Sequence, residues 1–162
     1  MASQTSPGQS LYKGSCHCGF VTYTAQLDLF NPSPDRRESL VTKCNCTICC
    51  KSGAVLATPN SKDGLTLLTP VEGESALGDY MYNTKSLHHY FCPKCGIKCF
   101  LKGVFHHQGK DYPVVRVNIL TLDGKADGSP MEDFRDIKIM YWNAKYNLDD
   151  PPADKPYEGG IW

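Results

Sequence analysis

The nine cysteines are the residues of this 162-residue chain that are best suited to chemistry. They fall into three groups: "GSCHCGF" holds Cys16 and Cys18, "KCNCTICC" holds Cys44, Cys46, Cys49 and Cys50, and "YFCPKCGIKCF" holds Cys92, Cys95 and Cys99. An odd number of cysteines cannot pair completely within one chain, and the first dozen residues lack the cationic and apolar segments of a signal peptide. We therefore expect a cytoplasmic protein whose thiols bind metal, rather than a disulfide scaffold.

The motif "FCPKCG" is typical of a zinc knuckle, in which the sulfurs of Cys92 and Cys95 converge on one ion. A structural zinc site needs four ligands, with sulfur at about 2.3 Å from the metal. Cys16 and Cys18 form a C-x-C pair followed by glycine and are the natural source of the other two. These four cysteines are the predicted structural zinc site.

The remaining C-x-C-x-x-C unit supplies three thiolates, from Cys44, Cys46 and Cys49. Three protein ligands with an open fourth position are the usual format of a catalytic zinc, so we expect a second zinc ion here. Spacing alone leaves another arrangement open, in which Cys50 or Cys99 completes a second closed site. The simpler reading of Cys50 is a small apolar residue, and that of Cys99 is a buried thiol on a strand.

A zinc ion with three thiolates carries one net negative charge, and a bound substrate thiolate would add another. Lys43 and Lys51 flank the cluster, and we expect one of them to offset this charge and to contact substrate. Candidates for a proton donor are found elsewhere in the chain: His88, His89, Tyr90 and Asp133. Because successive side chains of a strand point to opposite faces, at most one of the adjacent histidines can point at a given site.

The pattern of β-branched and aromatic residues between short turn signals predicts a mainly β protein with short helical turns only. Expected strands cover residues 19–27, 54–59, 65–70, 87–92, 97–103, 112–120 and 137–142, with one short helical turn at residues 49–52. Residues 1–12 and 31–39 are polar and proline-containing, typical of loops or extended segments. We expect one zinc-binding β domain over residues 13–145 and an irregular C-terminal arm, residues 146–162, packed on it.

Charge and hydropathy narrow the range of partners. The 17 basic residues balance the 17 acidic residues, so the chain gains little from counterion release and we expect no nucleic-acid partner. No apolar stretch approaches the length of a membrane span, so we expect no membrane partner. The sequence permits a homodimer.

The three motifs, in this order and with these gaps, resemble the glutathione-dependent formaldehyde-activating enzyme family, which also includes centromere protein V. The resemblance runs from about Gly14 to Phe100 and implies a small antiparallel β-tent fold. It also implies a structural zinc on Cys16, Cys18, Cys92 and Cys95, and a catalytic zinc on Cys44, Cys46 and Cys49. This sequence departs from the family pattern at Cys50 and Cys99.

The activity that the resemblance implies is carbon–sulfur lyase chemistry in detoxification, in which glutathione adds through sulfur to formaldehyde or is released from the adduct. An alternative keeps the site but changes the substrate to another sulfur conjugate or a specialised metabolite. A second alternative is a non-catalytic zinc module that binds a protein partner, with both metals structural.

Overall fold

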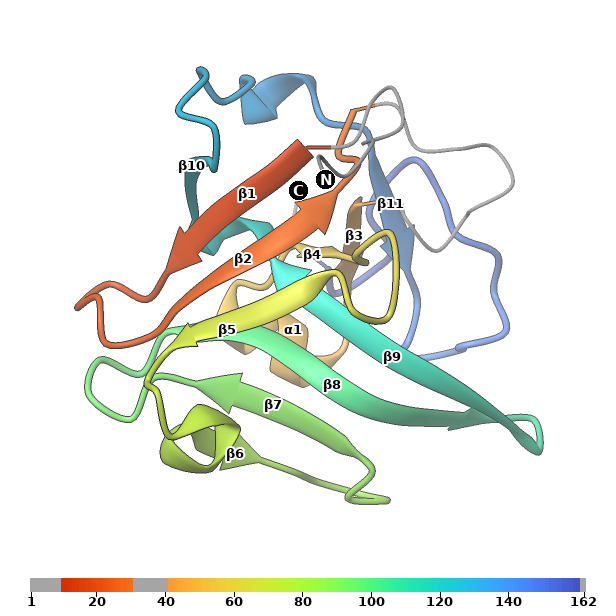
Figure 1. Cartoon of the computed structure of the whole chain (residues 1–162). Coiled ribbons are helices and arrows are strands. Elements are labelled where there is room, and N and C mark those ends of the chain that lie inside the picture. The colour runs from red at the N-terminus through yellow and green to blue at the C-terminus, as the bar shows by residue number, and fades with distance from the viewer. Residues whose placement is uncertain (1–9, 31–40, 161–162) are drawn as a thin grey trace.

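The computed structural model describes residues 10–30 and 41–160, which form two β-sheets packed face to face (Figure 1). The smaller sheet is antiparallel and has the order β10-β1-β2-β5. Its strands are β1 (Ser10–Ser15), β2 (Thr22–Leu27), β5 (Leu65–Thr69) and β10 (Leu122–Lys125). Gly14 pairs with Tyr23 across β1 and β2, and a Cβ at Gly14 would lie only 2.3 Å from the Tyr23 ring. The glycine therefore makes room for an aromatic ring that lies in the core.

The larger sheet has seven strands in the order β11-β3-β4-β9-β8-β7-β6. In chain order these are β3 (Val41–Cys44), β4 (Leu56–Ala57), β6 (Gly78–Tyr80), β7 (Leu87–Phe91), β8 (Lys98–His107), β9 (Lys110–Asn118) and β11 (Ile139–Trp142). All neighbours are antiparallel except β11 and β3, which run parallel. The helical segments are short: α1 (Thr47–Ser52), η2 (Gly73–Ala76), η3 (Ile119–Thr121) and η4 (Phe134–Asp136). The predicted fold class, mainly β with short helical turns only, is confirmed.

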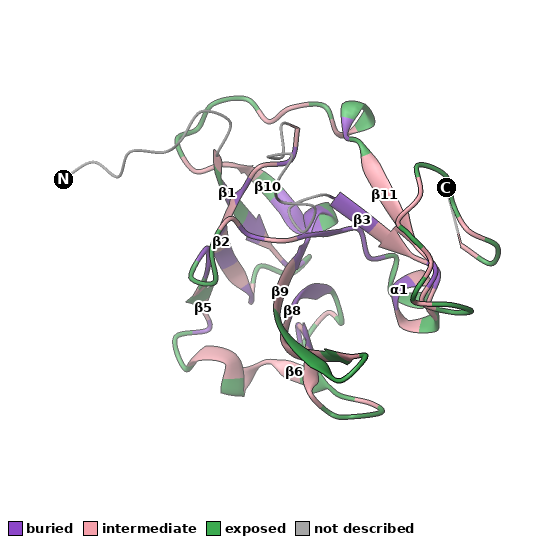
Figure 2. Cartoon of the chain, turned by 90° about the vertical axis from the view of Figure 1, so that its right-hand side faces the viewer, coloured by how far each residue is buried: buried purple, intermediate pink, exposed green. Residues whose placement is uncertain are grey.

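The two faces of the larger sheet have different surroundings. The face that carries Tyr90 and Phe100 packs against the smaller sheet and forms the main core. The opposite face, which we call the outer face, carries Leu87 and Leu101, which belong to a second apolar cluster with Cys49 of α1. Figures 1 and 2 together place α1 on the side of the larger sheet away from the smaller sheet.

The predicted strands are present, with changed bounds. The strand expected at residues 54–59 is reduced to two residues in β4, whereas β8 extends to His107. Four strands, β1, β3, β6 and β10, were not predicted because they are short or polar. The first nine residues and the loop predicted at residues 31–39 lie outside the described residues.

The C-terminal segment joins the larger sheet at a single backbone bridge. The backbone N–H of Tyr141 in β11 donates to the carbonyl of Ala153 at 2.8 Å, and the N–H of Ala153 donates back at 3.0 Å. Figure 2 shows this segment beside α1 and β11. Over the described ranges, no helix combines the length and the apolar character needed to span a membrane.

Candidate metal centres

Two turns bring four thiols together at one end of the fold. Cys16 and Cys18 follow β1, and Cys92 and Cys95 lie in the turn between β7 and β8. Their Sγ atoms all lie within 4.8 Å of one another, with Cys16–Cys18 and Cys18–Cys92 separations of 3.6 Å. Tetrahedral zinc with sulfur at about 2.3 Å requires sulfurs roughly 3.8 Å apart, so this four-thiol site fits zinc.

Backbone amides support the sulfurs of the four-thiol site. The N–H of Val21 donates to Sγ of Cys16 at 3.2 Å, and the N–H of Lys94 donates to Sγ of Cys92 at 3.4 Å. Burial raises the pKa of Cys92 to about 11, because Cys92 has no exposed surface. Hydrogen bonding from the backbone of Ile97 contributes most to lowering the pKa of Cys95 to about 6. Hydrogen bonds to sulfur favour the thiolate, the form that binds metal.

A second cluster forms where β3 passes into α1. Cys44 ends β3, Cys46 is the N-cap of α1, and Cys49 lies one helical turn later. Residues three apart share one side of a helix, so the C-x-x-C spacing points both sulfurs the same way. The three Sγ atoms lie within 4.8 Å of one another, and this three-thiol site can hold a metal ion.

The three thiols share their charge unequally. Hydrogen bonding with Cys44 and Cys49 lowers the pKa of Cys46 strongly, whereas hydrogen bonding with Cys44 and Cys46 raises the pKa of Cys49. The first proton therefore leaves Cys46. Within residues 10–30 and 41–160, no fourth cysteine, histidine or carboxylate joins this cluster.

The two remaining cysteines lie outside both clusters. The Cys50 thiol donates to the carbonyl oxygen of Cys44 at 3.6 Å and lies 3.8 Å from the carbonyl oxygen of Gly159. Cys99 is 1% exposed and lies in the main core, where burial raises its pKa to about 12. These positions agree with the simpler interpretation of each residue: Cys50 is a small side chain beside a ligand, and Cys99 is a buried thiol.

An asparagine between two of the thiols fixes the loop of the three-thiol site. Asn45 is buried; its amide donates to Oδ1 of Asn143 at 2.6 Å and to the carbonyl of Glu158 at 3.1 Å. Its Oδ1 accepts from the N–H of Lys145 at 2.9 Å. Sequence reasoning missed Asn45, because its partners lie about a hundred residues away and carry no local signal.

A buried lysine from a distant strand, which the sequence analysis did not predict, also lies near the three-thiol site. Lys98, the first residue of β8, is 8% exposed, and its Nζ has no hydrogen-bond partner among the described residues. Burial lowers the pKa of Lys98, whereas the charges of Cys49, Cys46 and Cys44 act in the opposite direction. The positive charge of Lys98 in turn contributes to lowering the pKa of Cys46.

The lysines predicted to flank the cluster lie differently. Lys43 is half-buried in β3, and burial lowers its pKa. Lys51 is exposed in the last turn of α1. Roles for Lys43 and Lys51 in substrate binding therefore stay predictions, while the charges of all three thiols act on Lys98.

Of the candidate proton donors, His89 lies on the outer face of the larger sheet, the side on which the three-thiol site lies. It lies opposite Leu101 in the β7–β8 ladder and so shares the outer face. His89 is 4% exposed, and neither ring nitrogen has a hydrogen-bond partner within the described chain. Burial, the main cause, lowers its pKa to about 4, with a further contribution from Lys98. His89 is therefore neutral at neutral pH.

The other three candidates are occupied elsewhere. His88 stacks on Tyr90 and pairs with Asp79 through Nδ1 at 2.7 Å, while Tyr90 packs in the main core. The expectation that His88 and His89 take opposite faces agrees with these contacts. Asp133 is exposed and pairs with Arg135 two residues later.

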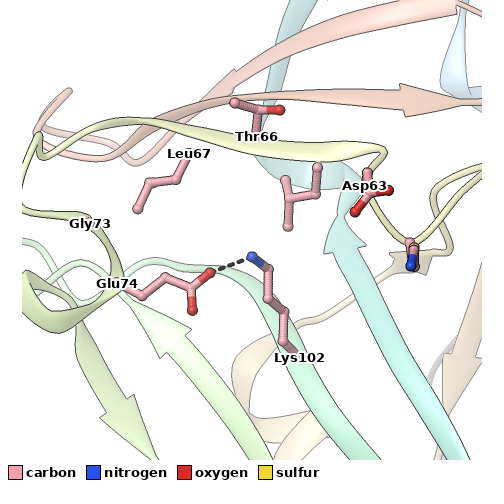
Figure 3. A pocket seen from close by; sticks show the side chains of 8 residues that line it. Asp63, Thr66, Leu67, Gly73, Glu74 and Lys102 are labelled. Atoms are coloured by element: carbon pink, nitrogen blue, oxygen red, sulfur yellow. Dashed lines mark hydrogen bonds and ion pairs between the residues drawn. The ribbon is translucent and has the colours of Figure 1, made fainter.

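A separate pocket of about 600 Å³ opens between β5 and η2, and no cysteine lines it. Figure 3 shows Lys102 of β8 and Glu74 of η2 pointing toward each other there, joined by an ion pair. The pocket therefore belongs to neither thiol site.

Comparison with known proteins agrees with this geometry. A crystal structure of a Rhodobacter sphaeroides protein is similar to 76% of this chain and 93% of its own, with 27% identity and a TM-score of 0.51. The family model described as glutathione-dependent formaldehyde-activating enzyme matches residues 11–136, a span that contains every cysteine of both thiol sites. The chain therefore belongs to the glutathione-dependent formaldehyde-activating enzyme family.

Proposed function

We propose that the protein is a zinc-dependent carbon–sulfur lyase that adds a thiol, such as glutathione, to a small carbonyl compound, such as formaldehyde, or releases it from the adduct. The observation that carries the proposal is the unequal division of sulfur. Four thiols surround one candidate metal position and three surround the other, with no fourth ligand from the described residues. We assign a structural zinc to the four-thiol site and a catalytic zinc to the three-thiol site.

A zinc ion at the three-thiol site would supply the positive charge that holds a substrate sulfur as its thiolate. The chain itself fixes the geometry, because Cys46 and Cys49 are held by α1 and the intervening loop by Asn45. In the addition, the sulfur–carbon bond forms, the carbonyl π bond breaks, and the proton lost from the thiol ends on oxygen. His89, neutral and on the outer face, is placed to orient the oxygen by a hydrogen bond.

Proton NMR exchange spectroscopy of glutathione with formaldehyde tests the proposal, because it measures the exchange rate above the fast spontaneous reaction. Wild-type protein should accelerate exchange, and Cys46→Ser should return the rate to the spontaneous value. Cys50→Ser is the matched control: it changes the neighbouring thiol that lies outside the cluster, and it should keep the wild-type rate. Equal rates for wild type and Cys46→Ser would reject the lyase.

Metal content provides a second test, which separates the lyase from a binding module. Atomic absorption should find two zinc ions per chain in the wild-type protein and fewer in Cys46→Ser. Glutathione should accelerate loss of one zinc ion to a chelator and leave the other unaffected. Two equally inert zinc ions, insensitive to thiols, would instead indicate that both metals are structural.

A further inference from the structure

A β-bulge decides where Lys98 points. In the β7–β8 ladder Tyr90 pairs with Phe100, and the next residue, Phe91, pairs with Lys98, so Cys99 is an extra residue on β8. Bulges of this kind bend a strand locally and change the direction of a side chain.

Without the bulge, Lys98 would share the face of Phe100, two residues away, and would enter the main core. With it, Lys98 shares the face of its partner Phe91, which is also the face of His89 and Leu101. The extra residue, Cys99, joins Phe100 in the main core. The bulge therefore moves the ammonium group from the core to the outer face, where the three-thiol site lies.

Several unpartnered polar groups gather around the three thiols. Nζ of Lys98 and both ring nitrogens of His89 are buried without partners, and both residues are more than nine-tenths buried. Nε1 of Trp142 is also buried without a partner in the described structure, and Trp142 is the register partner of Cys44. Tyr82 stacks on His89, with ring centroids 5.5 Å apart, and the charges of the three thiols act on it.

Buried polar groups without partners are rare and costly in folded proteins. Here they come from β7, β8 and β11, and the charges of the three thiols act on Lys98. A negatively charged oxygen beside a thiol-bound carbon would give the ammonium of Lys98 its missing partner.

Resting on the proposed function, we propose that Lys98 is a catalytic residue that holds the substrate oxygen as it becomes negative. When the substrate thiolate sulfur attacks the carbonyl carbon, the π electron pair moves to the oxygen, and the alkoxide forms against Nζ of Lys98. The proton released by the thiol then reaches this oxygen, giving the hydroxyl of the adduct. In the reverse reaction Lys98 stabilises the same alkoxide before the sulfur–carbon bond breaks.

The first test measures binding without turnover, on zinc-loaded protein by isothermal titration calorimetry. Mercaptoacetate carries a carboxylate on its thiol-bearing carbon, which places a negative charge one bond further from sulfur than the reacting oxygen, and ethanethiol is its uncharged counterpart. Charge-assisted hydrogen bonds predict a preference of about 10-fold or more for mercaptoacetate in the wild type. Lys98→Met should remove the preference and Lys98→Arg should keep part of it. Lys102→Met is the matched control, since Lys102 lies on the same strand and pairs with Glu74 instead.

The second test is the exchange rate with glutathione and formaldehyde. Lys98→Met should lower the catalysed rate about 100-fold or more, as loss of an oxyanion donor does, while zinc content and glutathione affinity stay near wild type. Equal preference for the two probes in wild type, or a preference that survives Lys98→Met, overturns the assignment. A protein that binds mercaptoacetate through Lys98 but does not accelerate exchange would overturn the proposed lyase and keep the oxyanion site.

Discussion

The buried histidine beside the three-thiol site should make the protein acid-sensitive in a predictable way. The pKa of His89 is lowered from 6.5 to about 4, mainly by burial; Lys98 and His88 also lower it, while Cys46 and Asp79 act in the opposite direction. In the unfolded chain the same imidazole keeps its ordinary pKa of about 6.5. Between these values the unfolded state binds more protons than the folded state, so stability falls as the pH falls through this window.

The size of the effect follows from the two pKa values. With one site at about 4 when folded and 6.5 when unfolded, acidification from about pH 7 to about pH 5 should lower the free energy of unfolding by ~2 kcal/mol. For a chain of this length, that corresponds to a fall in Tm of roughly 4–8 °C. The loss continues toward pH 4 and is absent above about pH 7.

His89→Phe isolates this contribution, because phenylalanine keeps a ring to stack on Tyr82 but does not titrate. The measurement is the free energy of unfolding by urea at about pH 7 and about pH 5, for wild type and variant. Zinc loss in acid affects both proteins and cancels in the double difference, which should be ~2 kcal/mol in favour of His89→Phe. His88→Phe, on the opposite face, should not show this gain. A double difference near zero for His89→Phe would refute the buried, neutral histidine.

Four further outcomes follow from the packing at the two thiol sites and in the main core. Cys92→Ser should leave the chain largely unfolded by circular dichroism, since zinc ligation supplies on the order of 10 kcal/mol, comparable to the whole stability of a domain. Cys46→Ser should stay folded under the same measurement, because its cluster lies outside the main core. Asn45→Ala should weaken zinc at the three-thiol site about 10- to 100-fold in chelator competition, because it removes the anchor of the ligand loop. Tyr23→Phe should lower the free energy of unfolding by about 1–2 kcal/mol in urea titration, since it removes the 2.6 Å hydrogen bond to Thr121.

The grouping of the thiols could be predicted from sequence because it is mostly local. Within residues 92–95 and within residues 44–49, the spacing along the chain already brings the sulfurs together. Only the contact of Cys16 and Cys18 with the first of these groups depends on strand pairing. Strand β1 escaped prediction because apolar Leu11 is exposed and Gly14, which has no side chain, is buried, so the apolar–polar alternation of a strand is not visible in its sequence.

The polar half of the candidate site could not be predicted in the same way. Lys98 reads in sequence as an ordinary strand lysine, and alternation with Phe100 would place it on the wrong face. Its true direction depends on a bulge that exists only in the pairing of β8 with β7. The sequence indicated Lys43 and Lys51 instead, because a sequence shows only which charged residues lie near the cluster along the chain.

The proposed role of Lys98 also implies a role for the four-thiol site beyond stability. The turn that holds Cys92 and Cys95 joins β7 directly to β8, and the backbone N–H of Cys92 donates to the carbonyl of Ile97 at 2.9 Å. The bulge begins at the next residue, so a metal that closes this turn also fixes the register in which Lys98 faces outward. The β7–β8 hairpin thus links a metal that is remote from the reaction to the side chain we assign to the reacting oxygen. Loosening of the four-thiol site should therefore reduce oxyanion binding before it unfolds the domain.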